Sequence, residues 1–416
     1  MSDFFQNGII TTLHDLGSRS REDLEAEVAR QARSSPVALV LPCLASELEG
    51  PALAPLVHHL ATMPWLGSIV VGLDQADGEA YQRAQRLFAT LPQPHQVIWN
   101  DGPRVTALVQ EWHQAGLAPR DRGKGHNIWL ALGLVQALGE AEVVALHDCD
   151  VVSFEPRMLA RLVFPVVHEE SGYAFAKGFY PRISREVMYG RVTRLFVTPL
   201  IRALRRCVPP SRYLEFLDSF RYPLAGECAM RISAARRLHL PSDWGMEIGV
   251  LTEVFRDHST RQLCQVDIAS GYDHKHQVFD LHQSQPDRGL ARMSRDITLS
   301  LFRGLASQGQ VVDLGLVRTV VTAYQRIVLD LMDSYAHDAA INGLQINRGQ
   351  EQQAVDFFAT NLFEAGRRFV EEDRQTPLTP TWDEVSRVLP DALPRLVEAV
   401  EADAADRADP GLRSPR

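Results

Sequence analysis

The chain has 416 residues, 45% hydrophobic and 23% charged, which is ordinary for a globular protein and excludes extensive disorder. Lys and Arg total 43 against 52 for Asp and Glu, and the net charge of -9 argues against a general nucleic-acid binder but allows local basic pockets for phosphorylated small molecules. The chain has five cysteines and no C-x-x-C pair, which predicts free thiols in a reducing cytoplasm. Its amino terminus does not resemble a signal peptide, and no apolar run is long enough to span a bilayer, so we expect no membrane contact.

Strand and helix patterns alternate in the first half of the chain. An amphipathic pattern at 19–33 predicts a helix. Four near-continuous apolar runs follow and predict strands that are buried on both faces, at 37–42, 67–73, 96–99 and 143–146. Helical patterns lie between them at 53–63, 79–91 and 127–138. This alternation predicts a doubly wound α/β unit.

The second half of the chain is less regular. Strand-like pieces at 173–180 and 263–268 predict that the sheet is mixed rather than purely parallel. After about residue 285 the pattern becomes helical, most clearly at 314–335 and 350–371. We therefore expect four regions, namely an amino-terminal arm and helix (1–35), an α/β domain (36–285), a helical extension (286–401) and a flexible tail (402–416).

Polar side chains follow each of the four predicted strands of the first half. Ligands of an open α/β sheet bind at the carboxyl ends of its strands, so these positions are candidates for one common site. A single acid there is compatible with an ordinary turn, but acids at four successive strand ends favour a function. The residues are Ser46 and Glu47, then Asp74, then Asp101, and finally Asp148 and Asp150.

The last of these groups is the most informative. Residues i and i+2 of an extended segment point to the same side, so Asp148 and Asp150 share one face. A carboxylate pair of this kind can hold a hard divalent cation and, through it, the phosphate oxygens of a nucleotide. The alternative is a polar turn that closes a buried strand.

A glycine-rich segment precedes the helical pattern at 127–138. Gly123 and Gly125 permit close approach of the backbone to a phosphate, and Lys124 between them supplies a positive charge. The segment is neither a Walker loop nor a Rossmann fingerprint, so those two nucleotide-binding classes are disfavoured.

Three further clusters have both a functional and a structural interpretation. His274 and His276 can complete a metal site or be ordinary surface residues. Glu247, beside an aromatic residue, can orient a sugar or lie in a capped helix turn. The segment 190–194 offers an amide, a guanidinium and a hydroxyl to an anion, or is a solvated helix face.

Taken in order, these segments resemble the glucosyl-3-phosphoglycerate synthase family of retaining GT-A-fold glycosyltransferases, over residues 36–280. The matching motifs are Leu41-Pro42-Cys43-Leu44 with Ser46-Glu47, Gly123-Lys124-Gly125, Asp148-Cys149-Asp150, Gly190-Arg191-Val192-Thr193, Pro223-Leu224-Ala225-Gly226-Glu227, Gly245-Met246-Glu247-Ile248-Gly249 and His274. Two features depart from the family pattern. Position 276 is His where the better-known bacterial members have Asn, and the helical carboxyl-terminal part is longer.

The resemblance implies a GT-A type doubly wound mixed sheet flanked by helices, with a carboxyl-terminal helical extension. It implies transfer of glucose from UDP- or GDP-glucose to 3-phosphoglycerate with Mg²⁺ or Mn²⁺, by a homodimer. The metal ligands would be Asp148, Asp150 and His274, and the catalytic residues Glu247, Asp150 and Lys124. Donor-binding residues would be Pro42, Leu44, Ser46, Glu47, Asp74, Gly123, Lys124, Asp148 and Cys149. Acceptor-binding residues would be Gly190, Arg191, Val192, Thr193, Leu224 and His276.

Three other functions are compatible with parts of this pattern. A mannosyl-3-phosphoglycerate synthase using GDP-mannose differs only in the configuration of the donor sugar at C2. A sugar-phosphate nucleotidyltransferase would carry a Gly-rich, basic signature after the first strand, whereas 46–49 is acidic. A degenerate, non-enzymatic scaffold would have lost a metal ligand, and all candidates are present.

Overall fold

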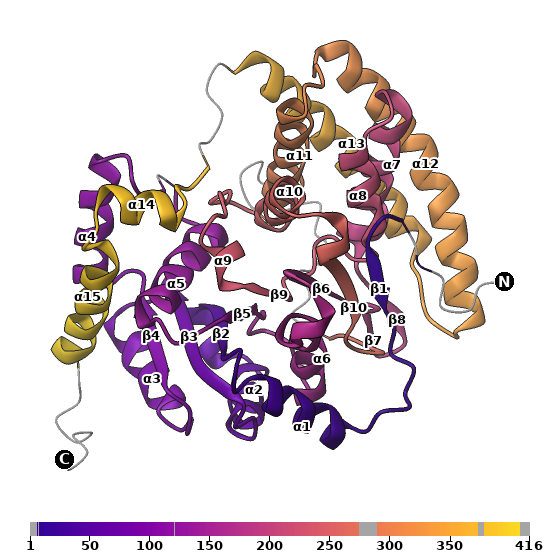
Figure 1. Cartoon of the computed structure of the whole chain (residues 1–416). Coiled ribbons are helices and arrows are strands. Elements are labelled where there is room, and N and C mark those ends of the chain that lie inside the picture. Colours follow the sequence, from indigo (N-terminus) through magenta and orange to yellow (C-terminus); the bar gives the residue numbers. More distant parts are fainter. Residues whose placement is uncertain (1–5, 7, 120, 274–288, 373–377, 408–416) are drawn as a thin grey trace.

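The computed structural model describes residues 6, 8–119, 121–273, 289–372 and 378–407. Its centre is an eight-stranded sheet with the strand order β1-β10-β6-β9-β5-β2-β3-β4 (Figure 1). The strands are β1 (Thr11–Leu13), β2 (Val37–Leu44), β3 (Leu66–Asp74), β4 (His95–Trp99), β5 (Val143–Leu146), β6 (Phe175–Phe179), β9 (Cys228–Arg231) and β10 (Leu263–Asp267). A separate hairpin pairs β7 (Ile183–Ser184) with β8 (Val187–Met188).

Helices cover both faces of the sheet (Figure 1). Those of the α/β region are α1 (Arg21–Gln31), α2 (Leu53–Ala61), α3 (Gly78–Phe88), α4 (Pro103–Gln114), α5 (Lys124–Leu138), α6 (Pro156–Val167), α7 (Thr198–Cys207), α8 (Arg212–Ser219), α9 (Ile232–Ala235) and α10 (Met246–Asp257). Those that follow are α11 (Gly289–Ser307), α12 (Leu314–Ile341), α13 (Arg348–Glu371), α14 (Trp382–Val388) and α15 (Ala392–Arg407).

The pairing of the strands confirms the predicted mixed α/β sheet. Strands β5, β2, β3 and β4 are parallel, and Val40 of β2 pairs with Val70 of β3 and Leu146 of β5. Strand β9 runs antiparallel between β5 and β6, which makes the sheet mixed. The carboxyl ends of the four parallel strands therefore lie along one edge, where a ligand site is expected.

Strand β2 shows why its sequence is apolar throughout. Val37, Leu39 and Leu41 belong to the core on the face covered by α1, α2, α3 and α6. Ala38 and Val40 belong to the core on the opposite face, where α5 packs. All five side chains are completely buried. Burial on both faces removes the alternation of polar and apolar residues that a half-exposed strand would show.

Helices α11, α12 and α13 form the extension that was predicted beyond residue 285. The apolar stripe of α12 is covered by the same chain, because Val320, Tyr324 and Ile327 are buried and the Tyr324 hydroxyl donates to the Leu195 carbonyl at 2.7 Å. Helix α12 packs against α7 and α13. In the described part of the chain, none of the helices combines the length and apolar character that a membrane span requires.

A homodimer stays a prediction, and it has to use a surface other than the covered stripe of α12. We expect light scattering at low micromolar concentration to give twice the mass of one chain. The mass of a single chain would contradict the dimer and leave only packing within the chain.

The carboxyl-terminal part differs from the predicted division. Helices α14 and α15 do not pack with α11–α13 but return to the α/β region, where α15 contacts α4 and α5 (Figure 1). The tail predicted from 402 is wrong for its first residues, because α15 continues to Arg407. Val400 and Asp403 are buried against the α/β region, and this burial holds the last turns of the helix in place.

Candidate functional site

A cavity of about 660 Å³ opens at the carboxyl ends of β2, β3 and β5, and its size suits a nucleotide sugar with a small acceptor. Of the residues predicted from the sequence, it is lined by Pro42, Leu44, Glu47, Asp74, Gly123, Lys124, Asp148, Cys149, Asp150, Gly190, Arg191, Val192, Leu224 and Glu247. Segments that are far apart in the sequence therefore meet in one place.

Asp148 lies in the turn that follows β5, packed closely against the backbone of Gly226. A Cβ atom at position 226 would lie 2.5 Å from Asp148 Oδ2, so only glycine leaves room for this carboxylate. The turn is fixed further by His147, whose ring Nδ1 lies 2.7 Å from the Asp148 carbonyl. The position of the first acid is thus set by its neighbours.

Lys124 lies between two carboxylates at the start of α5. Its Nζ is 2.8 Å from Asp148 Oδ1 and 2.9 Å from Glu247 Oε1. Burial disfavours the charged amine, but the two carboxylates outweigh burial and raise the pKa of Lys124 well above its usual value. Glu247 is in the first turn of α10, where the helix dipole favours an acid. The ammonium group is therefore a fixed positive charge in the cavity.

The Asp150 carboxyl lies among other acids. Burial, and then the neighbouring carboxylate of Asp148, raise the pKa of Asp150 to about 7, although Lys124 opposes the shift. Glu47 and Glu227 add to the repulsion. The carboxylates of Asp148 and Asp150 offer the hard oxygen ligands that a divalent cation prefers, and the cation would add positive charge here.

The structure gives only part of the metal shell. Among the described residues, no three His, Cys, Asp or Glu side chains form a complete ligand group. His274, the predicted third ligand, lies outside the described residues, as does the predicted acceptor residue His276. Asp148 and Asp150 are therefore the residues present that would hold a Mg²⁺ or Mn²⁺ ion.

The pKa of Asp150 predicts how metal affinity depends on pH. The carboxyl binds a cation only after losing its proton, and its pKa is about 7 without metal. We therefore expect Mn²⁺ affinity to fall by up to about tenfold per pH unit below neutrality. Mn²⁺ titrations followed by electron paramagnetic resonance over this range check the slope. An affinity that is constant below neutral pH would contradict this account of Asp150.

A second cluster holds the cavity wall at the ends of β3 and β4. The Arg122 guanidinium is 2.7 Å from Asp74 Oδ1 and 2.7 Å from Asp101 Oδ1. Asp101 also accepts a hydrogen bond from the Ala76 amide at 2.9 Å. Burial raises the pKa of the Asp74 carboxyl, and the Arg122 charge counteracts the shift. The cluster fixes Arg122 beside the Gly123-Lys124 loop.

Three further arginines line the cavity. They are Arg182, Arg191 and Arg292, and Arg182 donates to the Tyr222 hydroxyl at 3.1 Å. Burial lowers the pKa of the Arg191 guanidinium, with Glu351 acting in the opposite direction. Gly190 has a φ of +76°, a conformation that favours glycine. These guanidinium groups suit an anionic ligand.

A π-helical turn follows directly at Val192–Val197 and continues into α7. Turns of this kind are frequent at functional sites. Arg194 in the turn is 2.6 Å from the buried carboxylate of Glu351 on α13. This ion pair connects the helical extension to the turn that directly follows Arg191.

Two predicted site residues do not line the cavity. The Ser46 hydroxyl instead donates to Glu47 Oε1 at 3.3 Å. Thr193 is buried within the π-helical turn, and its hydroxyl has no hydrogen-bond partner among the described residues. Their predicted roles in binding donor and acceptor therefore find no support in this geometry.

Several lining residues were not predicted from the sequence. Arg122 directly precedes the Gly123-Lys124-Gly125 segment, and its positive charge was the available signal. Other polar residues follow β6, in keeping with the rule that strand ends carry site residues. The apolar lining from α11 and α13 could not be predicted from the sequence. A helix whose apolar side chains face a cavity has the same sequence pattern as a helix whose apolar side chains face a core. The residues are Arg122, Asn127, Tyr180, Arg182, Tyr189, Tyr222, Trp244, Leu290, Arg292, Met293, Ala354 and Phe358.

Comparisons with known proteins identify relatives of the chain. No family model matches the chain. The glucosyl-3-phosphoglycerate synthase of Persephonella marina is 39% identical over 406 residues, covering 98% of this chain and all of the relative. That of Methanococcoides burtonii is 34% identical over 408 residues, covering 97% of this chain and 98% of the relative.

Solved structures support the fold. Mannosyl-3-phosphoglycerate synthase from Rubrobacter xylanophilus matches with a TM-score of 0.54 at 22% identity, over 73% of this chain and 83% of that one. Glucosyl-3-phosphoglycerate synthase from Mycobacterium tuberculosis, in complex with Mn²⁺, UDP-glucose and phosphoglyceric acid, matches with a TM-score of 0.53 at 22% identity, over 71% and 88%. At this identity the matches show the GT-A fold. The two near-full-length relatives show more, and the chain belongs to the glucosyl-3-phosphoglycerate synthase family.

Proposed function

We propose that the protein transfers glucose from UDP-glucose or GDP-glucose to 3-phosphoglycerate and gives glucosyl-3-phosphoglycerate with retention at the anomeric carbon. The observation that carries this choice is near-full-length identity of 39% and 34% to two glucosyl-3-phosphoglycerate synthases. The cavity supports it, because its lining combines carboxylates that suit a metal-bound diphosphate with arginines that suit a phosphorylated acid.

On the donor side, we assign Asp148 and Asp150 to holding the metal. When bound, Mg²⁺ or Mn²⁺ supplies positive charge that stabilises the departing diphosphate. Lys124 adds a second positive charge, which its two carboxylate partners keep protonated at neutral pH. Asp74, Glu47 and the residues at the end of β2 enclose the nucleotide.

On the sugar and acceptor side, we assign Glu247 to positioning the glucose and stabilising positive charge on the ring. Its carboxylate is nearly buried and is held by Lys124, so it can act by orientation without forming a covalent bond. Arg191 and the Gly190 backbone hold the acceptor phosphate. The acceptor hydroxyl attacks from the face that the diphosphate leaves, and the diphosphate takes its proton.

The proposal extends to the organisation of the protein. We assign catalysis to the GT-A domain (36–285), with α11 and α13 of the extension closing the cavity. We also place the reaction in the cytoplasm, because the five free thiols suit a reducing compartment.

A panel of donors tests this function. Purified protein is incubated with 3-phosphoglycerate, Mg²⁺ and one of UDP-glucose, GDP-glucose or GDP-mannose, and products are read by mass spectrometry. We expect a hexosyl-phosphoglycerate with a glucose donor and its loss in excess EDTA. Turnover of GDP-mannose alone would identify a mannosyl-3-phosphoglycerate synthase instead.

A further inference from the structure

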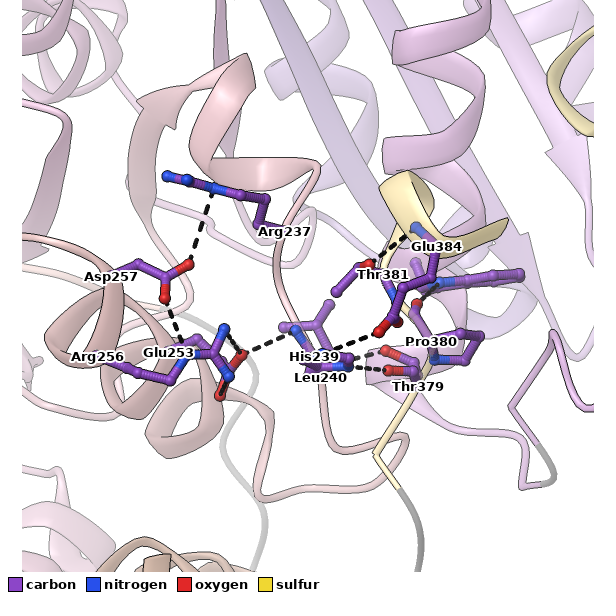
Figure 2. Close-up of polar contacts among 11 residues, drawn as sticks. Arg237, His239, Leu240, Glu253, Arg256, Asp257, Thr379, Pro380, Thr381 and Glu384 are labelled. Carbon is purple, nitrogen blue, oxygen red and sulfur yellow. Dashed lines mark hydrogen bonds and ion pairs between the residues drawn. The ribbon is translucent and has the colours of Figure 1, made fainter. Parts of the chain in front are cut away.

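The segment 378–407, which we call the strap, returns from the helical extension and docks on the α/β domain. Figure 2 shows its first contact, where Thr379 and Leu240 bind each other through main-chain and side-chain groups. The Thr379 carbonyl oxygen lies 2.9 Å from His239 Nδ1. The Pro380 carbonyl accepts a hydrogen bond from Trp129 Nε1 at 2.8 Å. The first residues of the strap therefore contact α5 and the segment 239–240, which precedes Glu247 in the sequence.

The strap packs on the helix that begins with Lys124. Trp382 stacks on Trp129 of α5 with ring centroids 4.4 Å apart, and its Nε1 donates to the Trp129 carbonyl at 2.8 Å. A Cβ atom at Gly133 would lie 2.1 Å from the Trp382 ring, so α5 carries a glycine where the ring is seated. This contact positions α15 for its own contact with α4.

The last contact of the strap caps another helix. The first residue of α4 is Pro103, and the capping position before it is Gly102, which has no side chain to bind the exposed backbone amides. Asp403 of α15 binds these amides instead, although it lies 299 residues after Arg104 in the sequence. Its carboxylate is buried and accepts from the amides of Arg104 at 3.0 Å and Val105 at 3.1 Å.

The fit between Asp403 and this turn is close. A Cβ atom at position 102 would lie 2.2 Å from Asp403 Oδ2, although the backbone of Gly102, with φ -62° and ψ 144°, is one that any residue can adopt. The glycine is therefore required by the approach of the carboxylate, and also by the Trp99 carbonyl, which a Cβ atom would meet at 2.9 Å. The capping position and its distant cap form a matched pair.

The capped turn carries a residue of the donor cavity. Asp101 directly precedes Gly102 and is 2.7 Å from the Arg122 guanidinium, which Asp74 holds from the other side. Both Asp101 and Arg122 line the cavity beside the Gly123-Lys124 loop. A displacement of the turn would therefore move Arg122, whereas Arg191, which we assign to the acceptor, belongs to a different segment.

We propose that Asp403 is a positioning residue for the nucleotide-sugar donor, acting through Asp101 and Arg122, so that the donor site is completed only when the strap is docked. This inference rests on the proposed function, because it assigns this end of the cavity to the donor. It predicts a change in donor affinity with little change in the acceptor or in the chemical step.

The test compares variants of the full chain with the preferred glucose donor, 3-phosphoglycerate and Mg²⁺. We expect Asp403→Ala to raise the donor KM about tenfold, with kcat and acceptor KM changing less than about twofold. Asp403→Asn keeps one acceptor oxygen and should recover part of the loss. Asp406→Asn is the matched control, because Asp406 is exposed on the same helix and pairs with the Arg104 side chain, which does not line the cavity. It should match the wild type.

Two further variants test the route of the effect. Gly102→Ala intrudes on the Asp403 carboxylate and on the Trp99 carbonyl, so it displaces the same turn and should raise the donor KM in the same way. It therefore tests the role of this turn even if Asp403→Ala does not fold. In an Arg122→Ala background, Asp403→Ala should add little, because the two residues act in one chain of contacts.

The outcomes separate this inference from the proposed function. An active wild type whose donor KM is unchanged by both Asp403→Ala and Gly102→Ala would overturn the role of the strap and leave the function standing. A full additional tenfold loss in the Arg122→Ala background would overturn the route through Arg122. A wild type that does not use a nucleotide glucose would overturn the proposed function itself.

Discussion

Replacing Asp150 with alanine is expected to abolish glucosyl transfer, by about a thousandfold or more, without loss of the fold. The carboxyl is one of two that would hold the metal, and neither Lys124 nor Asp148 can replace its ligand oxygens. Its raised pKa means that burial and neighbouring acids already disfavour its charge. We therefore expect the melting temperature without metal to stay close to that of the wild type.

Steady-state kinetics with saturating Mg²⁺, together with a thermal melt, check both parts of this prediction. Glu155→Ala is the matched control, because Glu155 is an exposed acid just beyond the same turn and does not line the cavity. It should retain full activity. Activity of Asp150→Ala near that of the wild type would remove the metal role of this residue.

Replacing Arg191 with alanine is expected to raise the KM for 3-phosphoglycerate about 10- to 150-fold, with little effect on donor KM. The residue lines the cavity and directly precedes the π-helical turn, whereas Asp74 belongs to the separate cluster at the ends of β3 and β4. Loss of a charge-assisted hydrogen bond to the acceptor phosphate accounts for the size of the effect.

The measurement is a KM determination for each substrate in turn. Arg202→Ala serves as control, because Arg202 is exposed on α7 and pairs with Asp218 outside the cavity. The wild type should also use unphosphorylated glycerate poorly. Equal use of glycerate and 3-phosphoglycerate by the wild type would show that Arg191 has no phosphate to bind.

The parts of the fold that the sequence could predict are those with a strong local pattern. The apolar run at β2 and the acid pair after β5 are examples, because a strand buried on both faces reads as continuous and a strand end exposes its polar residues. Strand β9, only Cys228–Arg231, was missed. Its placement between β5 and β6 depends on pairing partners far away in the sequence, which no local pattern records.

The site shows the same division between local and distant causes. Asp148, Asp150 and Lys124 stood out because charged residues interrupt apolar or glycine-rich segments. Thr193 does not line the cavity, because it is buried in a π-helical turn that the sequence does not reveal. Asp403, in contrast, lies in a stretch that read as the start of a tail, and its role depends on a helix end at residue 103.

The product of the reaction tests the central claim most directly. The protein is incubated with the glucose donor, 3-phosphoglycerate and Mg²⁺, and the anomeric proton of the product is examined by NMR. The account predicts an α-linked glucosyl-3-phosphoglycerate, with the configuration of the nucleotide sugar retained. A β-linked product would contradict attack from the face that the diphosphate leaves, and the absence of any glucosylated phosphoglycerate would contradict the proposed function.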